Sequence, residues 1–138
     1  MTDKYFIDSN IWLYTPIEGD HKKTHIARKI IALRPTVIST QVINEVSINL
    51  RKKCGYTEQE IRHFITHVSN ICKVHCLTSE TCLRASSLRE EHQFSFWDSL
   101  IVVSAIENNC NILYSEDMHH EMRVQNTLIL NPFYGEIH

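Results

Sequence analysis

Short, mostly apolar runs alternate along this chain with longer stretches of mixed polarity. The apolar runs are rich in β-branched and aromatic residues and are expected as strands at residues 5–8, 36–39, 73–77, 111–115 and 127–130. Helices are expected from residue 9, over 20–33, 41–53, 57–70, 79–92 and 96–109, and briefly over 118–122. This alternation is typical of an α/β fold whose parallel sheet is covered by helices on both faces.

The helix expected over 96–109 is apolar on nearly all sides. Trp97, Leu100, Ile101, Val102, Val103, Ala105 and Ile106 are its large or apolar members. A helix without a polar face is normally enclosed by protein. The pattern therefore predicts a largely buried helix, Trp97 included.

Length and composition add only general information on domain number and compartment. A chain of 138 residues is expected to form one domain over residues 1–138, and its 43% hydrophobic and 22% charged residues are ordinary for a globular protein. The five cysteines are odd in number and lack short paired spacing, which favours free thiols in the cytoplasm over a disulfide scaffold. Neither a signal peptide nor a membrane-spanning segment is expected.

Carboxylates lie where the expected strands end. Asp8 and Asp117 follow the first and fourth strands, Glu45 lies about two turns into the helix after the second, and Asp98 opens the buried helix. Right-handed crossovers start their helices at the carboxyl edge of the sheet, which is where α/β sheets bind ligands. We therefore expect the four acids to share one edge.

Each acid also has a purely structural interpretation. Asp8 and Asp117 suit helix caps, Asp98 suits a first helical turn behind a Ser95 cap, and Glu45 suits an exposed helix face. These interpretations account for single acids and not for their convergence. Carboxylates gathered without bases repel one another, and a divalent cation is the usual remedy. Ligands that are all oxygen favour Mg²⁺ or Mn²⁺.

With these residues in place, the chain resembles the PIN-domain family, and within it the VapC-like toxins of type II toxin–antitoxin modules. The stretches that carry the resemblance are FIDSNIWLY around Asp8, STQVINEV around Glu45, FSFWDSLIVVSA around Asp98 and ILYSEDM around Asp117. Each motif is weak alone, but all four occur in order and the resemblance covers nearly the whole chain.

The resemblance implies a three-layer α/β/α fold with a parallel sheet of about five strands in the order 3-2-1-4-5. It implies an endoribonuclease that depends on Mg²⁺ or Mn²⁺ and hydrolyses phosphodiester bonds with water that the metal activates. Asp8, Glu45, Asp98 and Asp117 would be its catalytic and metal-binding residues. Family members of the toxin type typically form homodimers, bind a cognate antitoxin and cut tRNA or ribosomal RNA.

Other polar residues are candidates for supporting roles. Ser9 and Asn10 match the small polar residues that usually follow the first acid of the family, and Ser115 and Glu116 lie beside the last. Lys22, Lys23, Arg28 and Lys29 form a basic cluster in a region, residues 1–56, that holds nine Lys/Arg against five Asp/Glu. Such a cluster suits contact with RNA phosphates, and equally a solvated helix face.

Some residues suggest a site and are better explained by packing. A zinc site could be sought among His63, His67, Cys72, His75 and Cys76, but Cys72 and Cys76 alternate with Val74 along an expected strand and should face the core. His119 and His120 are expected as an exposed helix pair. Trp12 and Tyr14 are expected in the core.

Two other functions remain open from the residues. The first is an aspartyl-phosphate hydrolase with Asp8 as the nucleophile, although Asn10 stands where such enzymes usually carry a second Asp. The second is a non-catalytic RNA-binding module on the PIN fold. A complete set of acids favours the nuclease over this second alternative.

Overall fold

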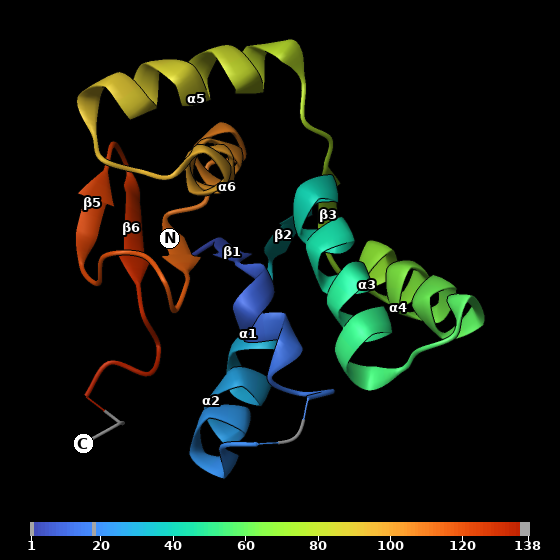
Figure 1. The fold of residues 1–138 in the computed structure, drawn as a ribbon. Helices are drawn as coiled ribbons and strands as arrows, with labels where there is room; N and C mark the ends of the chain where they lie inside the picture. The colour runs from blue at the N-terminus through green and yellow to red at the C-terminus, as the bar shows by residue number, and fades with distance from the viewer. Residues whose placement is uncertain (1, 18, 136–138) are drawn as a thin grey trace.

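The computed structural model describes residues 2–17 and 19–135 and has a six-stranded sheet at its centre (Figure 1). The strands are β1 (Tyr5–Ile7), β2 (Thr36–Ser39), β3 (Lys73–His75), β4 (Ile112–Tyr114), β5 (Met122–Val124) and β6 (Thr127–Leu130), in the order β3-β2-β1-β4-β6-β5. All neighbours pair in parallel except β5 and β6, which are antiparallel. The predicted parallel order is confirmed, with β6 as its fifth strand.

Six helices connect these strands in the described part of the chain. They are α1 (Ser9–Leu13), α2 (His21–Ile31), α3 (Thr40–Cys54), α4 (Glu58–Ile71), α5 (Ser79–Glu91) and α6 (Phe96–Glu107). Figure 1 shows α5 lying across α6 on one side of the sheet strands, while α1 and α2 lie on the other side and α3 and α4 run beside each other. The expected α/β architecture with helices on both sides of the sheet is therefore present.

Polar side chains at the helix starts explain why the helices begin where they do. Asp20, Ser39, Thr57, Thr78 and Ser95 each accept a backbone N–H of the first turn, which would otherwise lack a partner. Thr57 and Thr78 complete capping boxes with the third residue of their helices. The caps fix the start of α3 and α6, the two helices that carry Glu45 and Asp98.

The hydrophobic core follows the central strands and α6. Phe6, Val37, Leu113 and Ile129 are fully buried on four strands of the sheet. Every residue from Ser99 to Ala105 is buried as well, which confirms most of the predicted burial of α6. Trp12 is buried, as expected, and Tyr14 is half-buried against the core.

Three local expectations are wrong. The helix predicted over 118–122 does not form; Met122–Val124 instead pairs with β6 as a hairpin, because Gln125 adopts a positive φ of 53° in the tight turn between them. The third strand ends at His75, so Cys76 is exposed rather than in the core. Trp97 is 62% exposed, because the first turn of α6 projects beyond the buried part of that helix.

No helix in the described ranges, 2–17 and 19–135, has the length and apolar character needed to cross a membrane.

Candidate functional site

Asp8 lies directly after β1 and is almost completely buried, with 5% of its surface exposed. Its Oδ1 accepts the backbone N–H of Ser9 at 2.8 Å, and its Oδ2 accepts the hydroxyl of Ser115 at 2.9 Å. Burial raises the pKa of Asp8 to about 6; these two hydrogen bonds oppose that rise, and the charges of Asp98 and Asp117 add to it. The two hydrogen bonds hold the carboxylate in place, but they offset only part of the free energy that burial of its charge costs.

Glu45 reaches the same region from the second turn of α3. The side chain is half-buried, and its Oε1 is buried without a hydrogen-bond partner in the described structure. Burial raises the pKa of Glu45 to about 7; the charges of Asp8 and Asp98 add to this rise, and the side-chain amide of Gln41 opposes it. A buried carboxylate oxygen without a donor is unfavourable unless something else binds it.

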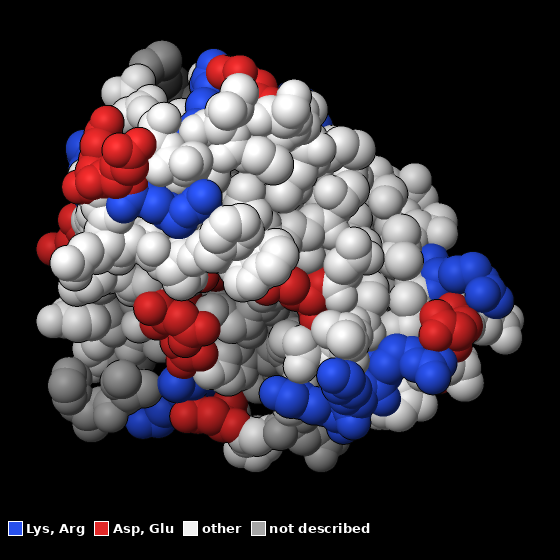
Figure 2. Space-filling model, turned by 45° about the horizontal axis from the view of Figure 1, so that its top comes forward, with Lys and Arg blue, Asp and Glu red and all other residues white. Residues whose placement is uncertain are grey.

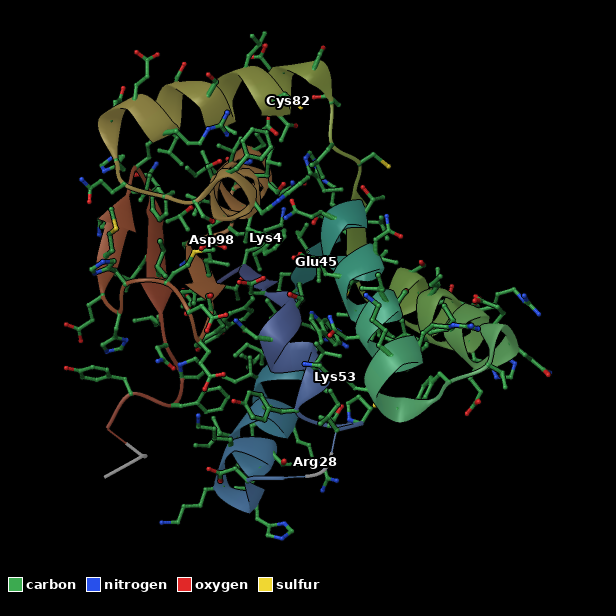
Figure 3. The ribbon with its side chains drawn as sticks, in the orientation of Figure 1. Lys4, Arg28, Glu45, Lys53, Cys82 and Asp98 are labelled. Carbon is green, nitrogen blue, oxygen red and sulfur yellow. The ribbon has the colours of Figure 1, made fainter. Side chains whose placement is uncertain are left out.

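Asp98 occupies the first turn of α6, where the Ser95 hydroxyl accepts its backbone N–H at 3.1 Å. Burial raises the pKa of Asp98, and the charge of Asp117 adds to the effect. Figure 3 shows Asp98 on α6 and Glu45 on α3, approaching the region above α1 from different sides. The interpretation of Asp98 as a residue of the first helical turn is thus correct, and the charge of Asp117 also acts on its carboxylate.

Asp117 lies in the loop after β4 and is exposed. Its Oδ2 accepts the Nδ2 amide of Asn10 at 3.0 Å, and the Oδ1 of Asn10 accepts the backbone N–H of Glu116 at 3.4 Å. Asn10 therefore joins the turn after β1 to the loop after β4. The interpretation of Asp117 as a helix cap is wrong, because the helix it would cap does not form.

Three of the four carboxylates, Asp8, Glu45 and Asp98, have pKa values that the charge of another of the four raises, as expected for acids on one edge of the sheet. The negative charges of Asp98 and Asp117 raise the pKa of Asp8, and those of Asp8 and Asp98 raise that of Glu45. Even so, no three His, Cys, Asp or Glu side chains among residues 2–17 and 19–135 converge closely enough to chelate one ion. What favours Mg²⁺ or Mn²⁺ is the chemistry of the donors, which are all carboxylate oxygens; Mg²⁺ usually keeps several waters and takes one or two protein carboxylates directly.

A family model matches most of the chain. The model of the PIN domain matches residues 5–123. The chain belongs to the PIN-domain family. No curated protein matches the sequence.

Solved structures share the fold of this PIN domain at low sequence identity. A toxin–antitoxin complex from Klebsiella pneumoniae is 17% identical with a TM-score of 0.70, covering 93% of this chain and 97% of its own. VapC20 of Mycobacterium tuberculosis, a toxin that cleaves the sarcin-ricin loop, is 19% identical with a TM-score of 0.64, covering 79% and 86%. VapBC2 of Rickettsia felis, bound to promoter DNA, is 16% identical with a TM-score of 0.64, covering 91% and 96%.

A second polar network lies beside the acids of this PIN domain. Glu116 pairs with the ammonium group of Lys23 at 2.5 Å and accepts the Tyr14 hydroxyl at 2.6 Å. The pair is mostly enclosed, with 21% and 20% of the two side chains exposed. Burial, followed by the hydrogen bond to Glu116, raises the pKa of Tyr14 to about 12. Glu116 thus supports the loop that carries Asp117, and Lys23 is committed to this pair.

The other members of the predicted basic cluster remain at the surface. Lys22, Arg28 and Lys29 lie on α2, and none of them forms an ion pair with another described residue. Figure 2 shows Lys and Arg side chains gathered along one side of a face that also carries acidic side chains in a recess, and Figure 3 shows Arg28 and Lys53 on different helices below the acids. Basic and acidic side chains are therefore both present on this face.

The alternative sites are not supported. His63, His67, Cys72, His75 and Cys76 do not form a group able to bind zinc within the described structure. His119 is exposed, whereas His120 stacks on Tyr134 at 4.1 Å and accepts the backbone N–H of Asn131 at 3.0 Å. The two histidines do not form the expected helix pair, and His120 has a packing role.

Two amide side chains of α3 near Glu45 were not predicted as part of the site. Gln41 donates from its Nε2 to the backbone oxygen of Trp97 at 3.2 Å, which links α3 to the start of α6. Asn44 is exposed one residue before Glu45. The sequence signal for this region was the Phe96-Trp97 pair. These two large aromatic residues lie in the first turn of α6, before its buried stretch begins, and Trp97 is the residue that Gln41 contacts.

Proposed function

We propose that this PIN domain, a single domain over residues 1–138, is an endoribonuclease that depends on Mg²⁺ or Mn²⁺. Asp8, Glu45, Asp98 and Asp117 are its catalytic carboxylates and would hold the metal. The observation that carries the proposal is their mutual influence at one edge of the sheet, with an unpartnered Glu45 oxygen buried among them. A divalent cation satisfies that oxygen and removes the repulsion.

The bound metal would activate water for attack on a phosphodiester and stabilise the charge that develops on the phosphate. The residues around it position the ligands. Ser9 and Ser115 orient the carboxylate of Asp8, and Asn10 orients that of Asp117. Lys22, Arg28 and Lys29 are proposed to bind phosphates of the RNA, with Lys23 acting through Glu116 instead.

In the biological setting that we propose, the protein is the toxin of a type II toxin–antitoxin module. It would form a homodimer in the cytoplasm, cut tRNA or ribosomal RNA, and be inhibited by a cognate antitoxin. Support comes from the fold shared with VapC20 and with the toxin–antitoxin complexes of Klebsiella pneumoniae and Rickettsia felis. A neighbouring small reading frame for a DNA-binding protein would support this setting.

The test of the activity compares the wild-type protein with three variants on total tRNA and ribosomal RNA in Mn²⁺, with EDTA as the metal-free control. Asp8→Asn and Asp98→Asn are expected to lose cleavage while keeping the wild-type circular dichroism spectrum. Glu90→Gln removes a carboxylate on α5, away from the site, and is expected to cleave normally. Equal cleavage by wild type and Asp8→Asn would contradict the proposal.

Aspartyl-phosphate chemistry with Asp8 as the nucleophile is the alternative enzyme function. Asn10, which donates to Asp117, stands where such enzymes usually carry a second Asp. Mass spectrometry of the protein after incubation with a phosphate monoester would detect a phosphoryl group on Asp8. A protein that binds RNA but cleaves none with either metal would instead be a non-catalytic module.

A further inference from the structure

Two large aromatic side chains stand in solvent beside the acids. Phe96 and Trp97 are 55% and 62% exposed, and they precede Asp98 in the first turn of α6. Their rings meet edge to face with centroids 5.2 Å apart. Most of the helix that follows is buried, so the two rings form an apolar projection at the border of the site.

Trp97 also lines a pocket that reaches the acids. The pocket has a volume of about 440 Å³ and is lined by Thr40, Gln41, Asn44, Glu45, Leu77 and Trp97. Glu45 belongs to both the pocket and the carboxylate site. A molecule bound in the pocket would therefore lie next to the reacting centre.

The polar groups of the pocket are suited to a flat ligand with hydrogen-bonding edges. The Nε2 of Gln41 donates to the backbone oxygen of Trp97 and its Oε1 is buried, so this amide is fixed and forms part of the pocket wall. The exposed Asn44 adds a second amide. Amide oxygens and nitrogens read the donors and acceptors at the edge of a nucleobase.

A cationic side chain, Arg89, packs against the aromatic pair. The guanidinium of Arg89 lies 4.3 Å from the centre of the Phe96 ring. One of its nitrogens donates to the hydroxyl of Ser99 at 2.7 Å, and that hydroxyl donates to the backbone oxygen of Phe96 at 2.6 Å. These contacts hold the first turn of α6 in place and bring positive charge close to it.

We propose that this pocket is a base-binding subsite of the nuclease. It holds one unpaired base of the RNA next to the bond that is cut. Trp97 stacks on the face of the base, and Asn44 contacts its edge. The proposal rests on the proposed function and adds to it that the substrate is single-stranded at this position, because a base within a duplex cannot expose its face.

The chain allows a direct measurement, since it has two tryptophans and Trp12 is 5% exposed whereas Trp97 is 62% exposed. The probe is a four-nucleotide single-stranded RNA added with Mg²⁺ to the Asp8→Asn variant, which prevents cleavage. Stacking should quench the fluorescence of Trp97, and the additional change Trp97→Phe should remove the quenching. An oligomer of ribose phosphates without bases should bind weakly and quench little.

Affinity provides the second measurement. Trp97→Ala is expected to weaken binding of the four-nucleotide RNA by about five- to a hundredfold. Asn44→Ala should change the preference among the four bases. Leu83→Ala is the matched control, because Leu83 is 65% exposed on α5 and lies outside the pocket; its RNA affinity should equal that of the Asp8→Asn parent.

Equal binding of the base-free oligomer would overturn the proposal. So would an unchanged RNA affinity in Trp97→Ala combined with weaker binding of a co-expressed inhibitor protein, which would make the pocket a protein-docking surface. Base-dependent quenching in a protein that cleaves no RNA would support the subsite and overturn the proposed nuclease activity alone.

Discussion

The hydroxyl of Ser115 donates to the Oδ2 of Asp8 at 2.9 Å, between residues 107 positions apart in the chain. This bond joins the end of β1 to the end of β4 beneath the proposed metal site. It also opposes the burial that raises the pKa of Asp8 to about 6. One buried serine therefore helps to orient the first acid and lowers its proton affinity.

Replacing this serine should change the pH dependence of the site. In Ser115→Ala the pKa of Asp8 should rise above about 6, because a bond that favours its charged form is removed. The pH at which half of the protein binds Mn²⁺ should rise accordingly, which isothermal titration calorimetry across pH 5 to 8 measures. Ser104→Ala is the control, since that buried hydroxyl donates to the backbone oxygen of Leu100 within α6. The same pH profile in both variants would contradict the role of Ser115.

Stability of the metal-free protein should fall as pH rises. Asp8 has its ordinary pKa of 3.8 when unfolded and about 6 when folded, and the pKa of Glu45 shifts from 4.5 to about 7. The folded state then binds more protons than the unfolded state from about pH 4 to 7, so the free energy of unfolding decreases through that window and levels off above it. Urea denaturation at a series of pH values measures this decrease.

The Asp8→Asn variant provides the companion measurement on stability. At pH 8 and without metal it should be more stable than wild type by about 1–2 kcal/mol, because a buried charge is removed while one hydrogen bond to an oxygen is broken. Added Mn²⁺ should stabilise wild type at pH 8 more than at pH 5, and Asp8→Asn less than wild type at both. A variant less stable than wild type at pH 8 would show that the carboxylate is needed for folding.

The pair of Lys23 and Glu116 should couple strongly. A double-mutant cycle with Lys23→Met and Glu116→Gln should give a coupling energy of about 1–2 kcal/mol, since both side chains are largely enclosed. The exposed pair of Arg51 and Glu58, 2.8 Å apart, serves as the control and should give about 0.5 kcal/mol or less. Equal values would mean that the first pair is no more than a surface interaction.

RNA binding should depend on the cations of α2. Changing Lys22, Arg28 and Lys29 together to Gln should make the salt dependence of RNA affinity shallower, by about 0.7 in the log–log slope for each phosphate that is no longer neutralised. Fluorescence anisotropy in the Asp8→Asn background measures this slope between about 50 and 200 mM salt. The matched control changes three exposed cations on other elements, Arg62, Lys73 and Arg123. An identical slope for both triple variants would rule out a specific role for α2.

Features set by local patterns were predicted well from the sequence. Apolar runs predicted the strand at residues 36–39 and the buried stretch of α6. The end of the first apolar run predicted that Asp8 lies directly after a strand. Features that depend on contacts with distant parts of the chain were not predicted. Met122–Val124 is a strand because β6 lies beside it, and Trp97 is exposed because the first turn of its helix projects beyond the packed layers.

The interplay of the site residues needed the structure for the same reason. The four acids were expected at one edge of the sheet from the rules of right-handed crossovers. No such rule predicts that Asn10 holds Asp117, that Lys23 is committed to Glu116, or that Glu45 has an oxygen without a partner. Each of these facts depends on where a side chain lies relative to a residue far away in the chain.

The position of β1 between β2 and β4 has a consequence for synthesis of the protein. Asp8 leaves the ribosome early, but the serine that binds it comes 107 residues later. A nascent chain that lacks residues 112–117 cannot complete the parallel pairing on one side of β1, and long-range pairing of this kind forms late. A partly translated chain therefore carries its first acid without an assembled carboxylate site until residues 112–117 have been made.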